Sequence, residues 1–598
     1  MAVEQWARGN QNVQITEVAA GASIAVTFNQ QTRRVPLEPA MIPVGRNVKS
    51  PARLLRARSG VLPFVDRAGL LTGLERWMTG PEPFAVYLIG GRGGSGKTRL
   101  GVELCVRARR RDWLCGLLSR TAEPAQLEAL ADIPTPRLVV VDYAESRGEQ
   151  LEVALPWLAE RATAEHPLRL LLLVRSPPRR SQDWTEPLRG RADWLDSVLD
   201  DIDVWVLDES PPNRAERAEL FSSAAAAFTT RDDPDTSAGT LPVPEPPAAL
   251  DGPAFANPLL VAMTAYLAVH DPEGAVPASR DALLTELAGH EDRHWQAAAQ
   301  SEDLDVGREL RQRVVALATL AGADTEQEAV QLLQLLPDLT AVDTERLHGL
   351  ARWARGLYPG QRWWNPLEPD LLGEYLVATH LTDCPGVLAG VLERSDPASL
   401  AQPLDVYARA APDHPSLASA LRSVLSANLV ALCRAAIQQA ATHTNRDALL
   451  GTTTTAAALE QVLKVITVDP STLPAAMGLL PGRADQILGP LALTLTDQVT
   501  DQLRRLAAGN PAAYDPDLAA VLNNLSNRLA DAGRRAEALT ASQDAVAVYR
   551  RLASGNPAAY EPVLALSLKN LSNHLAAAGR RDEAELVRRE ADGLGQNG

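Results

Sequence analysis

Lysine, cysteine and aromatic residues are scarce in this sequence of 598 residues. Aromatic residues make up only 4% of it. The chain has 58 basic residues, of which four are lysines and the other 54 are arginines; the lysines are Lys49, Lys97, Lys464 and Lys569. The four cysteines show neither C-x-x-C nor paired spacing, which argues against a disulfide framework or a zinc knuckle and favours a reducing cytoplasm.

Long hydrophobic runs are also missing. The longest candidate, Leu168 to Val174, contains Arg169 and suits a buried strand, so we expect no membrane span. Met1 to Asn10 lacks the basic and apolar lead of a signal peptide. The net charge of −16 opposes nucleic-acid binding, and we interpret the local arginine runs as solvated helix faces.

What is present is an ordinary globular composition, with 46% hydrophobic and 22% charged residues. A chain of this length is too long for one core and should hold about four units.

One stretch dominates the sequence. Gly91-Arg-Gly-Gly-Ser-Gly-Lys-Thr98 is a complete G-x-x-x-x-G-K-[ST] pattern, preceded by the β-prone run Ala85 to Gly90 and followed by apolar residues at helical spacing. Glycines let successive N–H groups surround phosphate oxygens, at the positive end of a helix. The pattern therefore predicts a nucleotide-binding P-loop, in which Lys97 reaches the β- and γ-phosphates and Thr98 binds Mg²⁺. The residues expected to bind nucleotide are all eight of the motif: Gly91, Arg92, Gly93, Gly94, Ser95, Gly96, Lys97 and Thr98.

The lysine itself supports this interpretation. A chain that uses arginine almost everywhere places a lysine here, where a slim ammonium fits among phosphates better than a planar guanidinium. The alternative is a glycine-rich turn with a chance lysine.

Two further apolar runs end in charged residues. Arg137 to Glu145 reads as a buried parallel strand whose carboxyl end presents Asp142, to hold Mg²⁺ through water, and Glu145, to orient or deprotonate a water. Leu168 to Arg175 repeats the pattern, and Arg175 could sense the γ-phosphate; a salt bridge at a strand end is the alternative. Asp203 to Leu207 is another strand candidate.

Around this core we expect other elements. Val13 to Phe28 suggests a small β-hairpin, and Ser50 to Met78 is predicted to be helical. Trp363 and Trp364 are expected in a core and not in a ligand cage. His290-Glu-Asp-Arg-His294 matches the zinc motif H-E-x-x-H, but two charged residues separate the glutamate from the second histidine, so a surface helix is the preferred interpretation.

The C-terminus contains an internal repeat. Leu522 to Ala538 recurs as Leu568 to Ala584, 46 residues later. The pattern resembles the tetratricopeptide repeat, with Gly533 between the helices, although its usual period is 34 residues. The extra length implies a longer second helix or an added turn around Asn-Pro. Because two repeats rarely suffice alone, we expect them to stack on the helices of residues 385–509.

With these motifs, the chain resembles the STAND class of signal-transduction NTPases, relatives of NACHT and NB-ARC proteins, in the form common in actinobacteria. Asp142 and Glu145 match the Walker B acids, and Arg175 matches the arginine after the next strand. Ala256 to Leu260 is similar to the Gly-x-Pro motif of the lid, in which the proline, here Pro258, approaches the nucleotide base. Pro369 to Leu371 takes the place of a Met-His-Asp motif that holds ADP, without its histidine.

The resemblance implies a multidomain α/β plus α fold: a P-loop parallel sheet, a helical lid, a winged helix and helical repeats. The expected segments are a β-rich start (1–49), the NTPase core (50–228), a Pro/Asp-rich linker (229–254), the lid and winged helix (255–383), a helical region (384–500) and the repeats (501–598).

The function implied is a cytoplasmic switch and slow ATPase that binds ATP or ADP with Mg²⁺, in stress or phage defence. Its repeats would bind a protein partner, and the ATP form would assemble into a homo-oligomer. The alternative is an ATP-dependent transcriptional regulator that uses the winged helix on DNA, which the acidic charge disfavours. A third possibility, a metabolic P-loop kinase, does not explain the lid and repeats.

Overall fold

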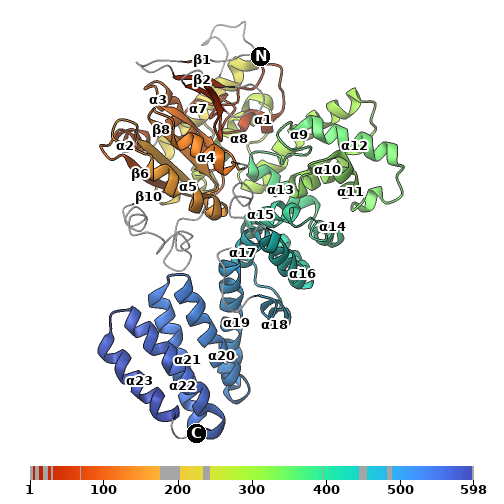
Figure 1. Ribbon diagram of the computed structural model, residues 1–598. Coiled ribbons are helices and arrows are strands. Elements are labelled where there is room, and N and C mark those ends of the chain that lie inside the picture. Colours follow the sequence, from red (N-terminus) through yellow and green to blue (C-terminus); the bar gives the residue numbers. More distant parts are fainter. Residues whose placement is uncertain are drawn as a thin grey trace. The chain divides into compact units, whose positions relative to one another are not determined.

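The computed structural model describes residues 5–6, 13–17, 24–28, 31–66, 69–120, 122–175, 202–232, 243–394, 396–442, 454–480 and 488–595. These form two compact units (Figure 1). The first contains the described residues up to 175 together with 202–391, and the second contains those from 392 onward.

The N-terminal segment forms an antiparallel sheet. The expected hairpin is present as β2 (Val13–Glu17) and β3 (Ile24–Phe28), paired from Val13 with Phe28 to Glu17 with Ile24. Two further strands flank it, β1 (Gln5–Trp6) and β4 (Gln31–Arg34), so the order is β1-β2-β3-β4. The sheet is therefore larger than the predicted hairpin. Sequence did not indicate β1, which has two residues, or β4, which has no apolar residue.

A six-stranded sheet forms the centre of the first unit, in the order β10-β6-β9-β8-β7-β5. Five strands are parallel: β6 (Phe84–Gly90), β7 (Leu114–Leu118), β8 (Arg137–Asp142), β9 (Leu168–Val174) and β10 (Asp203–Val206). The antiparallel edge strand β5 (Leu37–Glu38) pairs with β7. The carboxyl ends of β6, β9 and β8, which are adjacent, therefore meet at one edge of the sheet.

Helices α2 (Leu70–Met78) and α3 (Lys97–Arg109) share a hydrophobic core with this sheet. Gly101 on α3 lies close to the strands: a Cβ there would lie 3.1 Å from Val140 and 3.5 Å from Leu173. The close packing brings the start of α3 to the ends of β8 and β9. Helices α4 (Pro124–Ala131) and α5 (Gly148–Glu160) pack on each other.

Two buried arginines explain how charged residues fit into the apolar strands. Arg169 on β9 donates to the carbonyl of Trp77 (3.2 Å), in the last turn of α2, and to that of Gly80 (2.8 Å), two residues beyond the helix. Arg137 on β8 donates in the same way to the carbonyls of Leu130 and Ala131, at the end of α4. Each guanidinium thus donates to carbonyls at or just beyond the end of a helix, where free acceptors are common.

The predicted continuous helix over Ser50 to Met78 was wrong. The structure has a short helix, α1 (Pro51–Leu55), and none of the described residues between it and α2 is helical. Gly60 and Gly69 adopt left-handed backbone conformations (φ +70° and +68°), which break a right-handed helix, and Pro63 lies between them.

The rest of the first unit is helical, as predicted. Its helices are α7 (Arg214–Asp232), α8 (Pro258–His270), α9 (Arg280–Ser301), α10 (Arg308–Ala321), α11 (Glu326–Leu333), α12 (Thr344–Leu357), α13 (Asp370–His380) and α14 (Pro385–Gly390). An antiparallel bridge joins Ala323, after α10, to Trp364, after α12. This pairing ties the end of α10 to the segment after α12, and the winged-helix domain stays a prediction.

The tryptophan pair divides between core and surface. Trp364 is 1% exposed and donates to the carbonyl of Ala351, as expected of a core residue. Trp363 is only partly buried: the guanidinium of Arg355 lies 3.8 Å from the centre of its ring. The prediction of a core position was therefore correct for Trp364 and wrong for Trp363.

The second unit begins with α15 (Ala401–Ala410), α16 (Pro415–Thr442), α17 (Thr455–Val465), α18 (Leu473–Met477) and α19 (Gly489–Gly509). By length and composition, α16 could cross a membrane, with a mean hydropathy of 1.4 over its apolar window. This helix is longer than Leu168 to Val174, the longest candidate expected from sequence. Leu421, Leu425 and Leu429 are fully buried against neighbouring parts of the unit.

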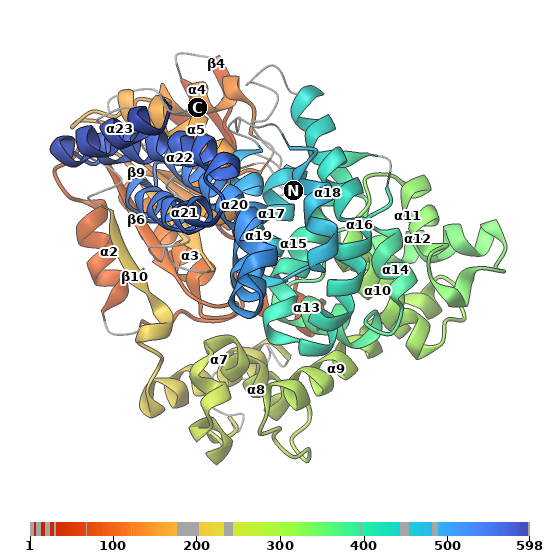
Figure 2. The same cartoon turned by 90° about the horizontal axis from the view of Figure 1, so that it is seen from below.

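The repeats form two helix pairs: α20 (Pro511–Asp531) with α21 (Arg535–Gly555), and α22 (Pro557–Ala577) with α23 (Arg581–Gly595). They lie side by side in chain order, and α19 packs on α20 as expected (Figures 1 and 2). Gly533 and Gly579 make the turns, with φ +79°. Both helices of the first pair have 21 residues, so the long period comes from two long helices, with no added turn at Asn-Pro.

Candidate nucleotide-binding site

The P-loop connects β6 to α3. Gly94 and Gly96 have φ values of +79° and +99°, which L side chains rarely adopt. Space is a second constraint: a Cβ on Gly93 would lie 3.0 Å from the guanidinium of Arg175. The glycines of the motif therefore allow both the turn and the close approach of neighbouring groups.

Ser95 is the residue of the loop whose placement differs from the expectation. It is expected among the residues that surround phosphate, but it is buried, with 5% of its surface exposed. Its backbone N–H donates to the carbonyl of Arg92 at 3.2 Å, which closes a turn inside the loop. Its hydroxyl oxygen lies beside Gly91, where a Cβ would be 2.8 Å away. Because this N–H bonds within the protein, Ser95 shapes the loop in this structure, and its contact with nucleotide stays a prediction.

Lys97 starts α3, and its side chain folds back over the loop. The ammonium donates to the carbonyl oxygens of Gly91 and Arg92, the latter at 3.0 Å. Burial lowers the pKa of Lys97, and the nearby carboxylates of Asp142 and Glu145 oppose this shift. A buried ammonium within the loop is a suitable partner for phosphate oxygens.

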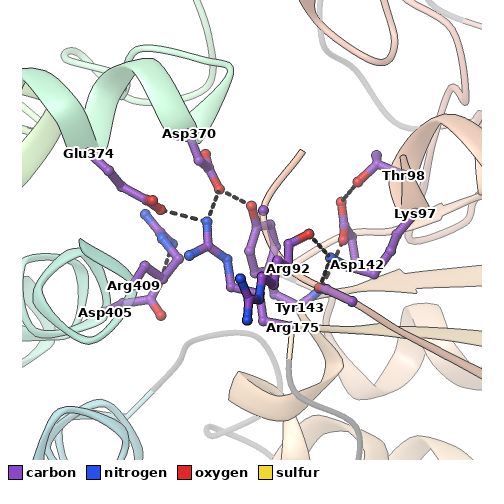
Figure 3. Close-up of polar contacts among 12 residues, drawn as sticks. Arg92, Lys97, Thr98, Asp142, Tyr143, Arg175, Asp370, Glu374, Asp405 and Arg409 are labelled. Carbon is purple, nitrogen blue, oxygen red and sulfur yellow. Dashed lines mark hydrogen bonds and ion pairs between the residues drawn. The ribbon is translucent and has the colours of Figure 1, made fainter. Parts of the chain in front are cut away.

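Thr98 and Asp142 meet across the sheet edge. The Thr98 hydroxyl donates to Asp142 Oδ2 at 2.9 Å, although the residues are 44 positions apart (Figure 3). Burial raises the pKa of the Asp142 carboxyl, while Thr98 and Lys97 counteract this. A hydroxyl and a carboxylate oxygen at this spacing are the ligand types that Mg²⁺ uses beside bound phosphates, so these residues fit the predicted cation.

Glu145 lies one short turn beyond β8. Its Oε1 accepts a hydrogen bond from the backbone N–H of Arg175 at 3.0 Å. The other oxygen, Oε2, is buried and has no hydrogen-bond partner among the described residues. Burial raises the pKa of this carboxyl. One oxygen thus orients the side chain, and the second remains available to a water.

Arg175 follows β9, and its guanidinium contacts helix α13. It lies 2.6 Å from Glu374, whose side chain is 2% exposed, and 3.6 Å from Asp370 (Figure 3). The hydroxyl of Tyr143 also bonds to Asp370. Of the two roles expected for Arg175, phosphate sensor or partner in a salt bridge at a strand end, this structure shows the salt bridge.

Tyr143 has an unusual backbone. Its φ of +55° lies in the left-handed region, which is rare for a bulky residue. The guanidinium of Arg120 lies 5.3 Å from the centre of its ring, and its backbone carbonyl accepts a bond from Ser146 at 3.0 Å. Strain of this kind persists where surrounding contacts hold it. Tyr143 lies between Asp142 and Glu145 in the sequence, and this backbone conformation directs its hydroxyl toward Asp370 on α13.

The loop has two further supports. Asp208 Oδ2, just after β10, accepts the backbone N–H of Arg92 at 2.8 Å. On another side, the start of α8 meets the loop: the Asn257 side chain donates to the Gly93 carbonyl at 2.7 Å. Pro258, predicted to approach the base, is the first residue of α8 and follows this contact directly.

These supporting residues were largely missed from sequence. Tyr143, Asp208 and Glu374 match no motif, and their partners are at least 116 positions away. Two features could have drawn attention: Tyr143 lies between two predicted catalytic acids, and Glu374 interrupts the apolar stretch of α13.

The zinc motif on α9 has another role. Glu291 is fully buried and accepts hydrogen bonds from the Ser50 hydroxyl (2.7 Å), the backbone of Ala52 (2.9 Å) and the Tyr358 hydroxyl (2.6 Å). Within the described residues, no group of three or more His, Cys, Asp or Glu side chains could hold a metal ion. The motif therefore anchors α1 and α12 to α9.

Comparisons with known proteins agree with parts of this description. Residues 518–557 match the family model of the tetratricopeptide repeat, which confirms the repeats. No curated protein matches the chain. Among solved structures, the chain is similar to a signal transduction ATPase with numerous domains (STAND) protein from Pyrococcus horikoshii, which has a tetratricopeptide repeat sensor.

That structure shares 12% identity over 89% of this chain and 84% of its own, with a TM-score of 0.28. At this TM-score the two chains do not superpose well as wholes. Fold and repeats together define a P-loop α/β protein with C-terminal tetratricopeptide repeats.

Proposed function

We propose that this chain is an ATP-dependent signal-transduction switch of the STAND type. ATP with Mg²⁺ binds at Gly91 to Thr98, and slow hydrolysis resets the protein and makes no product that the cell needs. Lys97 binds the β- and γ-phosphates, Thr98 and Asp142 hold Mg²⁺, and Glu145 orients the attacking water.

One observation carries this proposal: Arg175 lies against the P-loop and is bound by carboxylates of a helix almost 200 residues further along the chain. Its guanidinium is within contact distance of the Gly93 position and 2.6 Å from Glu374. A γ-phosphate at the loop would bring a competing anion to the same cation. Such competition links the occupant of the site to the position of α13.

The energetic requirement can be stated. Moving a two-state equilibrium from 1:99 to 99:1 takes about 5.5 kcal/mol of preferential binding. A charge-assisted hydrogen bond to a buried partner contributes roughly 1.5–3 kcal/mol. The bonds that phosphate oxygens make to Arg175 must therefore outweigh the bonds that Arg175 loses to Glu374 and Asp370.

The repeats serve in this proposal as the arm that binds a protein partner. Release of α13 in the ATP form then permits assembly into a homo-oligomer in the cytoplasm, with stress or phage defence as the setting. The buried Leu522, Leu525 and Leu568 give the arm its own core, consistent with a separate sensing part.

The experiment is a mass measurement of the full chain with ADP and with ATP, in the parent and in Lys97→Ala and Glu145→Gln. We expect assembly only with ATP, none in Lys97→Ala, and a persistent ATP-dependent assembly in Glu145→Gln, in which hydrolysis is slowed. A single mass in every state would refute nucleotide-dependent assembly.

A further inference from the structure

The start of α8 presents two hydrogen-bond donors to the P-loop. The side-chain amide of Asn257 donates to the Gly93 carbonyl at 2.7 Å, and the backbone N–H of Leu259 lies 3.2 Å from the Gly94 carbonyl. Residues 164 positions apart are thus joined through two consecutive peptide groups of the loop.

Asn257 also caps α8. Its Oδ1 accepts the N–H of Leu259 at 3.0 Å, and Pro258 occupies the first helical position. Capping alone needs only an acceptor, which Ser, Thr or Asp would supply equally well. The amide is required for the second bond, because only Asn offers a cap acceptor and an N–H donor on so short a side chain.

The loop is shaped to receive this side chain. A Cβ on Gly94 would lie 2.5 Å from Asn257 Oδ1, closer than any real contact. The φ of +79° at Gly94 independently favours glycine. Glycine at position 94 therefore leaves the space that the Asn257 side chain occupies.

The bond to the Gly93 carbonyl sets the direction of the next N–H. In a trans peptide the C=O and N–H groups point in opposite directions. A Gly93 carbonyl held toward α8 therefore turns the Gly94 N–H away from α8. Backbone N–H groups of this kind are what a P-loop offers to phosphate oxygens.

We infer that Asn257 is a positioning residue that couples the start of α8 to the P-loop and retains bound nucleotide. This deepens the proposed function and rests on it: while the two bonds hold, the loop keeps its phosphate-binding shape. When α8 moves away, the Gly93–Gly94 peptide is free to rotate and nucleotide is released.

The test compares nucleotide dissociation in variants of the full chain. Asn257→Asp keeps the cap acceptor but loses the donor, whereas Asn257→Ala loses both. Asn556 is the matched control, because it precedes a proline at the start of α22 and its Oδ1 accepts the N–H of Ala559 at 3.4 Å, far from any P-loop residue in the chain. Dissociation of fluorescently labelled ADP is measured by chase with unlabelled ADP, and folding by thermal unfolding.

We expect dissociation about tenfold faster in Asn257→Asp and Asn257→Ala, as for loss of one hydrogen bond in a partly buried setting. The unfolding temperature of Asn257→Asp should match the parent, and Asn556→Ala should dissociate ADP at the parental rate. Unchanged dissociation in a folded Asn257→Asp variant would overturn the inference and leave the proposed function intact. A parent chain that binds no ADP or ATP would overturn both.

Discussion

The P-loop edge of the sheet and the C-terminal repeats are built in different ways. At the P-loop edge, charged side chains are buried and contact residues far away in sequence, as Arg175 does with Glu374. In the repeats, most buried residues are leucine, alanine, valine and serine, Asp515 is the buried acid among those that the structure describes, and each helix packs on its chain neighbours. The comparison teaches that a change in one charge should propagate in the first region and remain local in the second.

The largest effect is expected at Glu145. Replacement by Gln removes the general base, so ATP hydrolysis should fall roughly 10²–10⁴-fold while ATP still binds. In the parent, the raised pKa of Glu145 means that the base is lost as pH falls through a value above the ordinary 4.5, and hydrolysis should decline there. Steady-state phosphate release, measured across pH, gives both the rate of hydrolysis and its pH dependence. If hydrolysis by Glu145→Gln still declines at low pH, the titrating group is not Glu145.

Lys97→Ala tests the buried ammonium. Loss of its charge-assisted bonds to phosphate should weaken ATP binding roughly 100-fold, measured by titration calorimetry. Lys569→Ala is the matched control in the other region, because Lys569 is exposed on α22. Similar affinities of the two variants for ATP would contradict the assignment of the P-loop.

Leu568→Ala tests whether changes in the repeats remain local. Leu568 is fully buried on α22, so the cavity should lower the free energy of unfolding of the repeats by about 3 kcal/mol. Leu566 on the same helix is 57% exposed, and its replacement by Ala should cost within about 0.5 kcal/mol. Urea unfolding gives both values. The affinity for ATP should not change in either variant. A weaker affinity for ATP in Leu568→Ala would show that the repeats are coupled to the P-loop.

Two ion pairs of equal length allow a direct contrast. Arg175–Glu374 and the exposed Arg550–Glu590 both measure 2.6 Å. Glu374→Gln should release Arg175 and raise the affinity for ATP relative to ADP about tenfold, whereas Glu590→Gln should leave this ratio unchanged. Competition binding of ATP against ADP measures the ratio; a Glu374→Gln value equal to the parent's would remove Glu374 from the switch.

The smallest effect is expected at His290, in the zinc-like motif. Burial lowers its pKa from 6.5 to about 4, so the folded state binds this proton less readily than the unfolded state. Its contribution to stability is complete above pH 6.5 and is lost as pH falls toward 4. His290→Gln should flatten that part of the profile of unfolding temperature against pH. Zinc should not change the unfolding temperature, and a rise on adding zinc would restore the metal interpretation.

Much of the fold could be predicted because buried parallel strands read as continuous apolar runs. This located β8, β9 and β10, and the meeting of strand ends placed Asp142, Glu145 and Arg175 near the P-loop. The repeats were visible as self-similarity, and the family model confirms them.

The rest depended on tertiary contacts. The lid-type motif drew attention to Pro258, and only the folded chain brings the side chain of Asn257 to Gly93. Asp370 was noted for its place in the ADP-binding motif, but its position beside Arg175, and that of Glu374, follows from the contact between α13 and the end of β9. The break between α1 and α2 was missed because the apolar pattern outweighed the glycines at positions 60 and 69.

A motif also does not specify what each of its residues does. The P-loop pattern marks all eight positions alike, yet the N–H of Ser95 closes a turn onto Arg92. Such a turn depends on the backbone path of the loop, which the pattern of residue types does not record.

The central claim is that bound ATP takes Arg175 from the carboxylates of α13. Amide hydrogen exchange across residues 370–380 tests this most directly, with Mg²⁺ and either ADP or a non-hydrolysable ATP analogue. We expect faster exchange with the ATP analogue than with ADP, and fast exchange with both in Arg175→Ala. Equal protection of α13 with the two nucleotides, both bound at saturation, would contradict the account.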